Sequence, residues 1–172
     1  MRSKLKEHLP FLVDAGWPPS LVFAAHCLLS LAFNAYDQMP SLDVPMHLLG
    51  GLAIAYFFHA FIRYGDRLGL VRVGSRRAEM IMVFGLVAAA TVVWELAEFL
   101  ADHYFHLGAQ PSVANTMKDQ LMGLVGGAGY IALSVRKESP REDAEIAIPG
   151  NSDYRQQPAP PADHLHARRT VR

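Results

Sequence analysis

The sequence predicts an all-α integral membrane protein: a bundle of four transmembrane helices with both termini cytoplasmic and a disordered C-terminal tail. Two observations lead to this prediction. The chain of 172 residues is 51% hydrophobic, and its apolar residues gather in four segments of about 20 residues, the length that spans the hydrocarbon core of a bilayer. These segments are residues 20–36, 44–62, 80–100 and 117–135. Because a backbone in lipid must satisfy its own hydrogen bonds, each segment is expected to be helical.

The predicted membrane domain, residues 20–135, lies between two polar regions. We assign residues 1–19 to the cytoplasm and the membrane interface, because a basic start is followed by prolines rather than by the apolar stretch and cleavage site of a signal peptide. Residues 136–172 are rich in proline and charged residues. They bury too little apolar surface to offset the entropy of ordering, so we expect a disordered cytoplasmic tail.

Basic residues alternate from one predicted loop to the next. The N-terminal region, the second loop and the tail carry lysine and arginine, whereas residues 37–43 and 101–116 carry none. Basic loops favour the cytoplasmic side of a membrane. The pattern therefore predicts a multi-pass protein of the bacterial inner (plasma) membrane with both termini inside the cell.

Acidic side chains in the third segment are the main candidates for function. Glu95, Glu98 and Asp102 are spaced i, i+3 and i+7, on one face of a helix. A carboxylate in hydrocarbon costs a few kcal/mol or more, so intramembrane acids usually face a bundle interior or a wet cavity. The predicted orientation brings further polar residues to the same outer layer, namely Asp43, His47, Asn115 and Asp119. We therefore expect an outward-facing polar pocket.

Two chemistries fit this set of residues. Imidazole and carboxylates on facing helices suit zinc, manganese or iron, and an oxygen-only subset suits magnesium or calcium. The candidate ligands for such a divalent metal are Asp43, His47, Glu95, Glu98 and Asp119. Without metal, crowded carboxyls cannot all ionise, so one acts as general acid and a neighbour as base. The acid/base candidates are Glu95, Glu98 and His47, with Asp102 and Asn115 expected to bind substrate.

This pocket favours a cell-envelope protein that binds or modifies an outer-leaflet lipid or lipid-linked molecule, with or without a divalent cation. Whether it is an enzyme stays open, because no nucleophile motif accompanies the acids. One alternative is a small ion or proton transporter, since chains of Asp, Glu and His mark such paths. The other is a structural cluster, in which the groups pair and Asp43 and Asn115 cap helices.

Membrane lipids and a second copy of the chain are the expected partners. Nucleic acid is not expected, because the formal net charge is zero. The pattern leaves open whether Asp37, His26, His103 and His106 join the pocket. Trp94 is expected to be a packing or interfacial aromatic. The glycines of the second and fourth segments are expected to let helices pack closely; these are Gly50, Gly51, Gly123, Gly126, Gly127 and Gly129.

Three motifs in this region resemble a known family. They are D-x3-H at Asp43 and His47, W-E-x2-E-x3-D at residues 94–102, and N-T-M-x-D-x3-G-x3-G at residues 115–127. Together they are similar to the YjdF-like family of small bacterial inner-membrane proteins and, more distantly, to the VanZ-like family, whose members include glycopeptide-resistance proteins. The resemblance covers about residues 42–130. It implies an integral membrane protein whose biochemical activity is not established.

The chain departs from both family patterns. Asn115 replaces the first acid of the last YjdF-like motif, and Met122 stands near the third, which leaves fewer carboxylates for a metal. The VanZ-like pattern has glutamine where this chain has Glu98 and continues with an arginine that is missing here. Glycopeptide resistance is therefore not expected of this chain.

Overall fold

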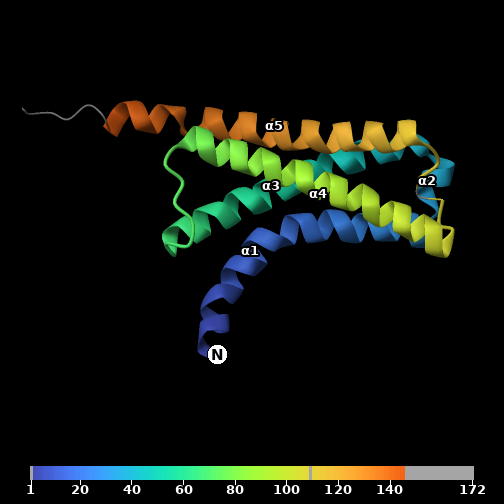
Figure 1. The fold of residues 1–172 in the computed structure, drawn as a ribbon, viewed down its shortest axis with the longest axis horizontal. Coiled ribbons are helices and arrows are strands. Elements are labelled where there is room, and N and C mark those ends of the chain that lie inside the picture. Colours follow the sequence, from blue (N-terminus) through green and yellow to red (C-terminus); the bar gives the residue numbers. More distant parts are fainter. Residues whose placement is uncertain (1, 109, 146–172) are drawn as a thin grey trace, which may run out of the picture. The chain divides into compact units, whose positions relative to one another are not determined.

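The computed structural model describes residues 2–108 and 110–145, in which all regular structure is helical (Figure 1). The elements are α1 (Arg2–Cys27), a π-helical turn η1 (Leu28–Ala32), α2 (Ala35–Gln38), a 3-10 turn η2 (Pro40–Leu42), α3 (Asp43–Arg67), α4 (Arg76–Phe105) and α5 (Val113–Glu145). The all-α prediction is confirmed for the described part of the chain. The chain divides into two compact units, Met1–Lys137 and Glu138–Arg172, and the helix bundle belongs to the first.

Three helical stretches among the described residues are long and apolar enough to cross a membrane, namely Val13–Ala32, Pro40–Arg67 and Arg76–Phe105. They contain most of the first predicted segment and all of the second and third. The first stretch starts inside residues 1–19, because α1 continues as one helix from Arg2. The fourth predicted segment lies on α5, where glycines and polar residues lower the hydropathy, and its crossing of the membrane stays a prediction.

α5 continues to Glu145, past the predicted end of the membrane domain at residue 135. The rest of the predicted tail, residues 146–172, lies outside the described residues.

The outward surface of the three apolar stretches is itself apolar. Leu31, Ile81 and Val93 expose 72%, 73% and 65% of their area, and only 6% of an apolar run of 18 residues within Val13–Ala32 is buried. A continuous apolar surface of this kind is unusual on a soluble monomer and suits contact with lipid tails. The exposure pattern therefore supports a membrane environment.

Small residues hold α3, α4 and α5 together. Ala55, Val83 and Val87 are fully buried where α3 meets α4. A β-carbon at Gly51 of α3 would overlap the carbonyl oxygen of Gly123 on α5. The predicted close approach of these helices is therefore confirmed, and it depends on backbone contacts that any side chain would block.

Not every predicted packing glycine takes part in these contacts. Gly126 and Gly127 do, since added β-carbons there would meet the backbone of Leu48 and the side chain of Val87. A β-carbon at Gly50 or Gly129 would meet nothing within 4 Å. The packing prediction is wrong for these two, because their helix faces point away from the α3–α5 contact.

α1 contacts the other helices despite its internal prolines. Pro18 has no backbone N–H, so the carbonyl of Asp14 loses its usual helical donor. The Tyr56 hydroxyl of α3 lies 3.5 Å from that carbonyl oxygen, and a donor from a neighbouring helix is the usual remedy in a membrane. Figure 1 shows the C-terminal half of α1 running beside α3 and α4, while its N-terminal half curves away.

One end of the bundle gathers the start of α3, the end of α4, the start of α5 and the short helix α2 (Figure 1). α4 ends at Phe105 and is followed by the left-handed residue His106, whose φ is 54°. The chain then reverses to begin α5 at Val113. Side chains from the ends of three helices therefore share one region.

We expect Gly51→Ala to destabilise the bundle by about 1–3 kcal/mol, the usual cost of overpacking, because its methyl group would enter the Gly123 carbonyl. The matched control is Gly129→Ala, whose methyl group meets open space. The measurement is the free energy of unfolding from titration with sodium dodecyl sulfate in mixed micelles. Equal values for the two variants would contradict the close contact.

Candidate functional site

His47 of α3 lies at the centre of a polar cluster at this end of the bundle. Its Nε2 lies 3.2 Å from Asp43 Oδ1, one helical turn earlier, and its Nδ1 lies 3.8 Å from Glu95 Oε1 of α4. The His47 side chain is 10% exposed and that of Glu95 is 4% exposed. We call the group the His47 cluster; it consists of Asp43, His47, Glu95, Glu98, Asn115, Lys118 and Asp119. The structure thus joins the acids of three helices, as the sequence predicts.

On one side of His47, α5 contributes a lysine to the cluster. Lys118 Nζ lies 3.1 Å from Asp43 Oδ2 and 3.3 Å from Asp119 Oδ1. It also donates a hydrogen bond of 2.9 Å to Asn115 Oδ1. Asp119 Oδ1 has no hydrogen-bond partner among the described residues, so its contact with Lys118 is an ion pair only. One ammonium therefore compensates two carboxylates.

Asn115 links the same two aspartates. Its amide nitrogen donates to Asp119 Oδ2 and lies 3.4 Å from Asp43 Oδ2. Asp119 is only 1% exposed, so its charge depends on these partners. The side chain of Asn115, expected to bind substrate, instead forms its hydrogen bonds within the cluster.

On the other side of His47, the glutamates of α4 have different partners. Glu98 Oε1 accepts a 2.9 Å hydrogen bond from the indole N–H of Trp94. Glu95 Oε2 accepts one of 3.2 Å from the Gln110 side chain. Glu95 Oε1 is buried without any hydrogen-bond partner, and a buried carboxylate oxygen in that state is costly. Trp94 is thus more than the packing aromatic that the sequence predicts.

Two sets of three possible metal ligands meet at His47. One is Asp43, His47 and Asp119; the other is His47, Glu95 and Glu98; within each set the ligand atoms lie within 4.8 Å of one another. The first set already has the Lys118 ammonium beside both of its aspartates. The second set contains the unpartnered oxygen of Glu95. The set of His47, Glu95 and Glu98 is therefore the better place for an added cation.

Gln110, which the sequence analysis missed, closes the loop between α4 and α5 over the cluster. Its backbone N–H donates to Asp102 Oδ2 at 2.7 Å, and its side chain donates to the Glu95 carbonyl oxygen at 2.7 Å. Asp102, expected to bind substrate, holds this loop and belongs to neither ligand set. No pattern in the loop sequence distinguishes Gln110, because its role follows from the chain reversal.

The capping alternative for Asp43 and Asn115 is wrong. α3 begins at Asp43 with Leu42 at its N-cap, and the Asp43 carboxylate bonds to His47 and Lys118 instead. At the start of α5, the Ser112 hydroxyl accepts the Asn115 backbone N–H at 3.1 Å. Ser112 therefore performs the capping that the sequence suggests for Asn115, because α5 starts at Val113 and not at residue 117.

Three of the four undecided residues lie outside the cluster. Asp37 is exposed and accepts a hydrogen bond of 2.8 Å from Asn34. His103 and His106 are exposed at the end of α4, and the His103 ring stacks on Phe99. None of the three belongs to a ligand set among the described residues.

The fourth, His26 of α1, lies beside the cluster. Its Nδ1 is 2.8 Å from the Tyr36 hydroxyl, and its ring meets Trp94 edge-on with centroids 5.2 Å apart. Burial, with the nearby Asp43 carboxylate, raises the pKa of Tyr36 to about 12. The phenol therefore stays protonated at physiological pH and holds the His26 ring in place.

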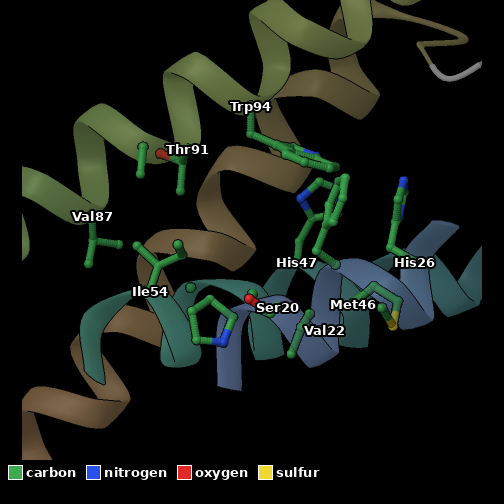
Figure 2. A pocket seen from close by; sticks show the side chains of 14 residues that line it. Ser20, Val22, His26, Met46, His47, Ile54, Val87, Thr91 and Trp94 are labelled. Atoms are coloured by element: carbon green, nitrogen blue, oxygen red, sulfur yellow. The ribbon is translucent and has the colours of Figure 1, made fainter. Parts of the chain in front are cut away.

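A pocket of about 400 Å³ between α1, α3 and α4 extends from His47 (Figure 2). Figure 2 shows His26, His47 and Trp94 toward one end and Ile54 and Val87 toward the other. Most of the remaining lining is apolar. The His47 cluster thus borders a mostly apolar space. The ring nitrogens of His26, His47 and Trp94 lie at the end near the cluster, and the hydroxyls of Ser20 and Thr91 lie farther along the pocket.

A second polar group lies at the opposite end of α3. His59 Nε2 is 3.2 Å from Glu79 Oε1, and His59 Nδ1 is 2.8 Å from the Tyr130 hydroxyl. Arg63 donates to the same Glu79 oxygen at 3.1 Å. The sequence analysis missed Glu79 because it lies just outside the third predicted segment. The group joins α3, α4 and α5 at that end.

The apolar helices and buried acids define a membrane protein with an internal polar centre. The chain belongs to the family described as "Predicted membrane protein (DUF2238)", whose family model matches residues 15–138. An uncharacterized protein of Thermotoga maritima is 26% identical over 117 residues, which is 67% of this chain and 59% of that protein. The chain thus matches less than two thirds of that relative's length. No solved structure matches the chain.

We expect Lys118→Met to destabilise the protein, because Asp43 and Asp119 would share a buried space without a cation. Lys118 is 38% exposed, so the loss should be about 1–2 kcal/mol rather than the 3–5 kcal/mol of a fully buried pair. The measurement is the free energy of unfolding in detergent for Lys118→Met, Asp119→Asn and the double variant. If the losses of the two single variants simply add in the double variant, the ion pair is not the cause of the destabilisation.

Proposed function

We propose that this protein of the bacterial inner membrane binds a divalent cation at His47, Glu95 and Glu98 and acts there on an outer-leaflet lipid or lipid-linked envelope molecule. The observation that carries the proposal is the arrangement around His47. One ring nitrogen faces Asp43 at 3.2 Å, and the other faces the unpartnered Oε1 of Glu95 at 3.8 Å.

The two ring nitrogens of His47 suit two different roles. A metal-binding histidine usually donates its second ring N–H to a carboxylate, which fixes the tautomer and the ring orientation. Asp43 Oδ1 is placed to accept that N–H from Nε2, which leaves Nδ1 as the ligand. We assign the tautomer from this hydrogen bond.

The spacing on the ligand side also suits one ion. Zinc bonds to histidine nitrogen and carboxylate oxygen at about 2.0–2.2 Å, so two atoms 3.8 Å apart can reach the same ion. Glu98 completes the set, and its bond from Trp94 fixes the carboxylate. Because Lys118 neutralises the other side of His47, we assign Asp43 and Asp119 to positioning rather than to metal binding.

A bound divalent cation would polarise a phosphoryl or carbonyl oxygen or lower the pKa of a bound water. The chain's own groups supply the remaining needs. Glu95 Oε1 is placed to be a ligand of the ion, since no hydrogen bond occupies it. The Gln110 side chain orients the Glu95 carboxylate through its other oxygen. Whether this centre only binds its ligand or also changes it is decided by the experiment below.

The proposed topology follows from the charged loops. The basic N-terminal region and the basic α3–α4 loop face the cytoplasm, which places the His47 cluster toward the outer leaflet. We propose α5 as a fourth crossing, because Gly51 and Gly123 pack it against α3. The YjdF-like resemblance of the three motifs agrees with this placement.

The packing favours this proposal over ion or proton transport. The His47 cluster and the group around His59 lie about 18 Å apart along α3, at 1.5 Å per residue. Ala55, Val83 and Val87 lie between them and have no exposed area, and the pocket that extends from His47 has Ile54 and Val87 toward its far end. A conducting path needs polar groups or water across that layer, and these three side chains offer neither.

The test is the metal content of protein purified without a histidine tag or chelator, measured by plasma mass spectrometry after dialysis against zinc or manganese. We expect close to one ion per chain in the wild type. Glu95→Gln and Glu98→Gln should retain fold and lose most of the metal, because each removes a charged ligand. The matched control is Asp37→Asn, which neutralises an exposed acid outside the His47 cluster that belongs to neither ligand set.

Equal metal content in wild type, Glu98→Gln and Asp37→Asn would exclude the proposed site. To separate binding from chemistry, lipid extracts of cells that lack the protein are compared after complementation with wild type or Glu98→Gln. A lipid species whose abundance depends on Glu98 would identify a modifying activity. Unchanged lipids with metal bound would leave a binding role.

A further inference from the structure

We infer that the pocket beside His47 holds one hydrocarbon chain of a membrane phospholipid, with the phosphate headgroup against the His47 cluster. The placement of the headgroup rests on the proposed function, whereas the placement of the hydrocarbon chain rests on the pocket alone. All lining residues lie within Val13–Ala32, Pro40–Arg67 or Arg76–Phe105. The pocket is therefore at bilayer depth, where lipid tails are the surrounding medium.

The polarity of the pocket matches an amphiphile. His26, His47 and Trp94 lie toward one end, and Ile54 and Val87 toward the other (Figure 2). An apolar cavity with a few polar groups at one end fixes both the identity and the direction of its ligand. The phosphate would reach the cation held by His47, Glu95 and Glu98, because phosphate oxygens bind divalent cations and cationic side chains well.

The volume of the pocket favours a narrow occupant over a peptide helix. About 400 Å³ corresponds to roughly one turn of a helix 10 Å wide with a pitch of 5.4 Å. A docked helix from another protein needs several turns of contact. A flexible hydrocarbon chain needs only a narrow space, so the size favours a lipid tail.

Gly50 forms part of the pocket wall, and this explains why it takes no part in helix packing. A β-carbon at Gly50 would meet nothing within 4 Å, whereas one at the adjacent Gly51 would overlap α5. A side chain at position 50 would therefore project into the pocket and leave the α3–α5 contact intact. The position offers a way to fill the pocket without touching the metal ligands.

The test uses the full chain in phosphatidylcholine vesicles that contain phosphatidylglycerol with a diazirine in one acyl chain. After illumination, the labelled residues are mapped by mass spectrometry. We expect label at the pocket residues Ile54 and Thr91. Gly50→Leu should lower that label roughly tenfold, the ratio that about 1.4 kcal/mol of overpacking produces.

The matched control is Gly85→Leu, the same substitution at a position of α4 that also meets open space and does not line the pocket. It should leave the pocket label unchanged. Label at Ile81, which is 73% exposed on the outer surface, should be equal in all variants. Pocket label that is absent from the wild type, or that Gly50→Leu does not lower, overturns the inference.

Metal content separates this inference from the proposed function. Gly50→Leu should bind as much zinc as the wild type, because it changes no metal ligand. Loss of the acyl-chain label while zinc is retained supports the lipid pocket. A second result is that the wild type binds no metal while Ile54 is labelled and Gly50→Leu removes the label. That result would support the acyl-chain pocket and exclude the metal site. If the wild type binds metal but no pocket residue is labelled, the metal site is supported and the acyl-chain pocket is excluded.

Discussion

The imidazole of His47 is the constraint on which the rest of the site depends. It has carboxylates on both sides, Asp43 at 3.2 Å from Nε2 and Glu95 at 3.8 Å from Nδ1. Because a neutral ring has one donor and one acceptor nitrogen, the hydrogen bond to Asp43 decides what Nδ1 can do. Lys118 beside Asp43 keeps that carboxylate charged and makes it a good acceptor. The chemistry on the Glu95 side is therefore set by groups on the opposite side of the ring.

Backbone packing is what lets α5 deliver that lysine. Gly123 and Gly126 bring α5 against α3 at distances that no side chain would allow, and Lys118 and Asp119 lie about one turn before Gly123 and two turns before Gly126. In lipid, where association gains little from burying apolar surface, such close contacts are a main source of helix affinity. The same glycines lower the hydropathy of α5, so the helix that completes the cluster is the least apolar of the long helices. Packing and site formation thus depend on the same residues.

Much of this arrangement was predictable from the sequence. Apolar length identified the helices, and the i, i+3 spacing of Glu95 and Glu98 placed them on one face with Asp43 and His47 opposite. The roles of Asn115 and Asp102 were not predictable, because they depend on how the loop after His106 reverses the chain. Lys118 was recognisable only as the one basic residue of the fourth predicted segment, residues 117–135. The pocket along α1 escaped prediction because it arises from helix placement, which no local pattern records.

Which atoms surround the cation is the most direct question about the site. X-ray absorption spectroscopy of the zinc-loaded protein, at the zinc edge, reports the number and type of ligands and their distances. A single imidazole together with carboxylate oxygens at about 2.0–2.2 Å is the expected first shell, and Glu98→Gln should change it. A shell of water oxygens without imidazole, or a wild-type shell identical to that of Glu98→Gln, would contradict a metal centre built on His47.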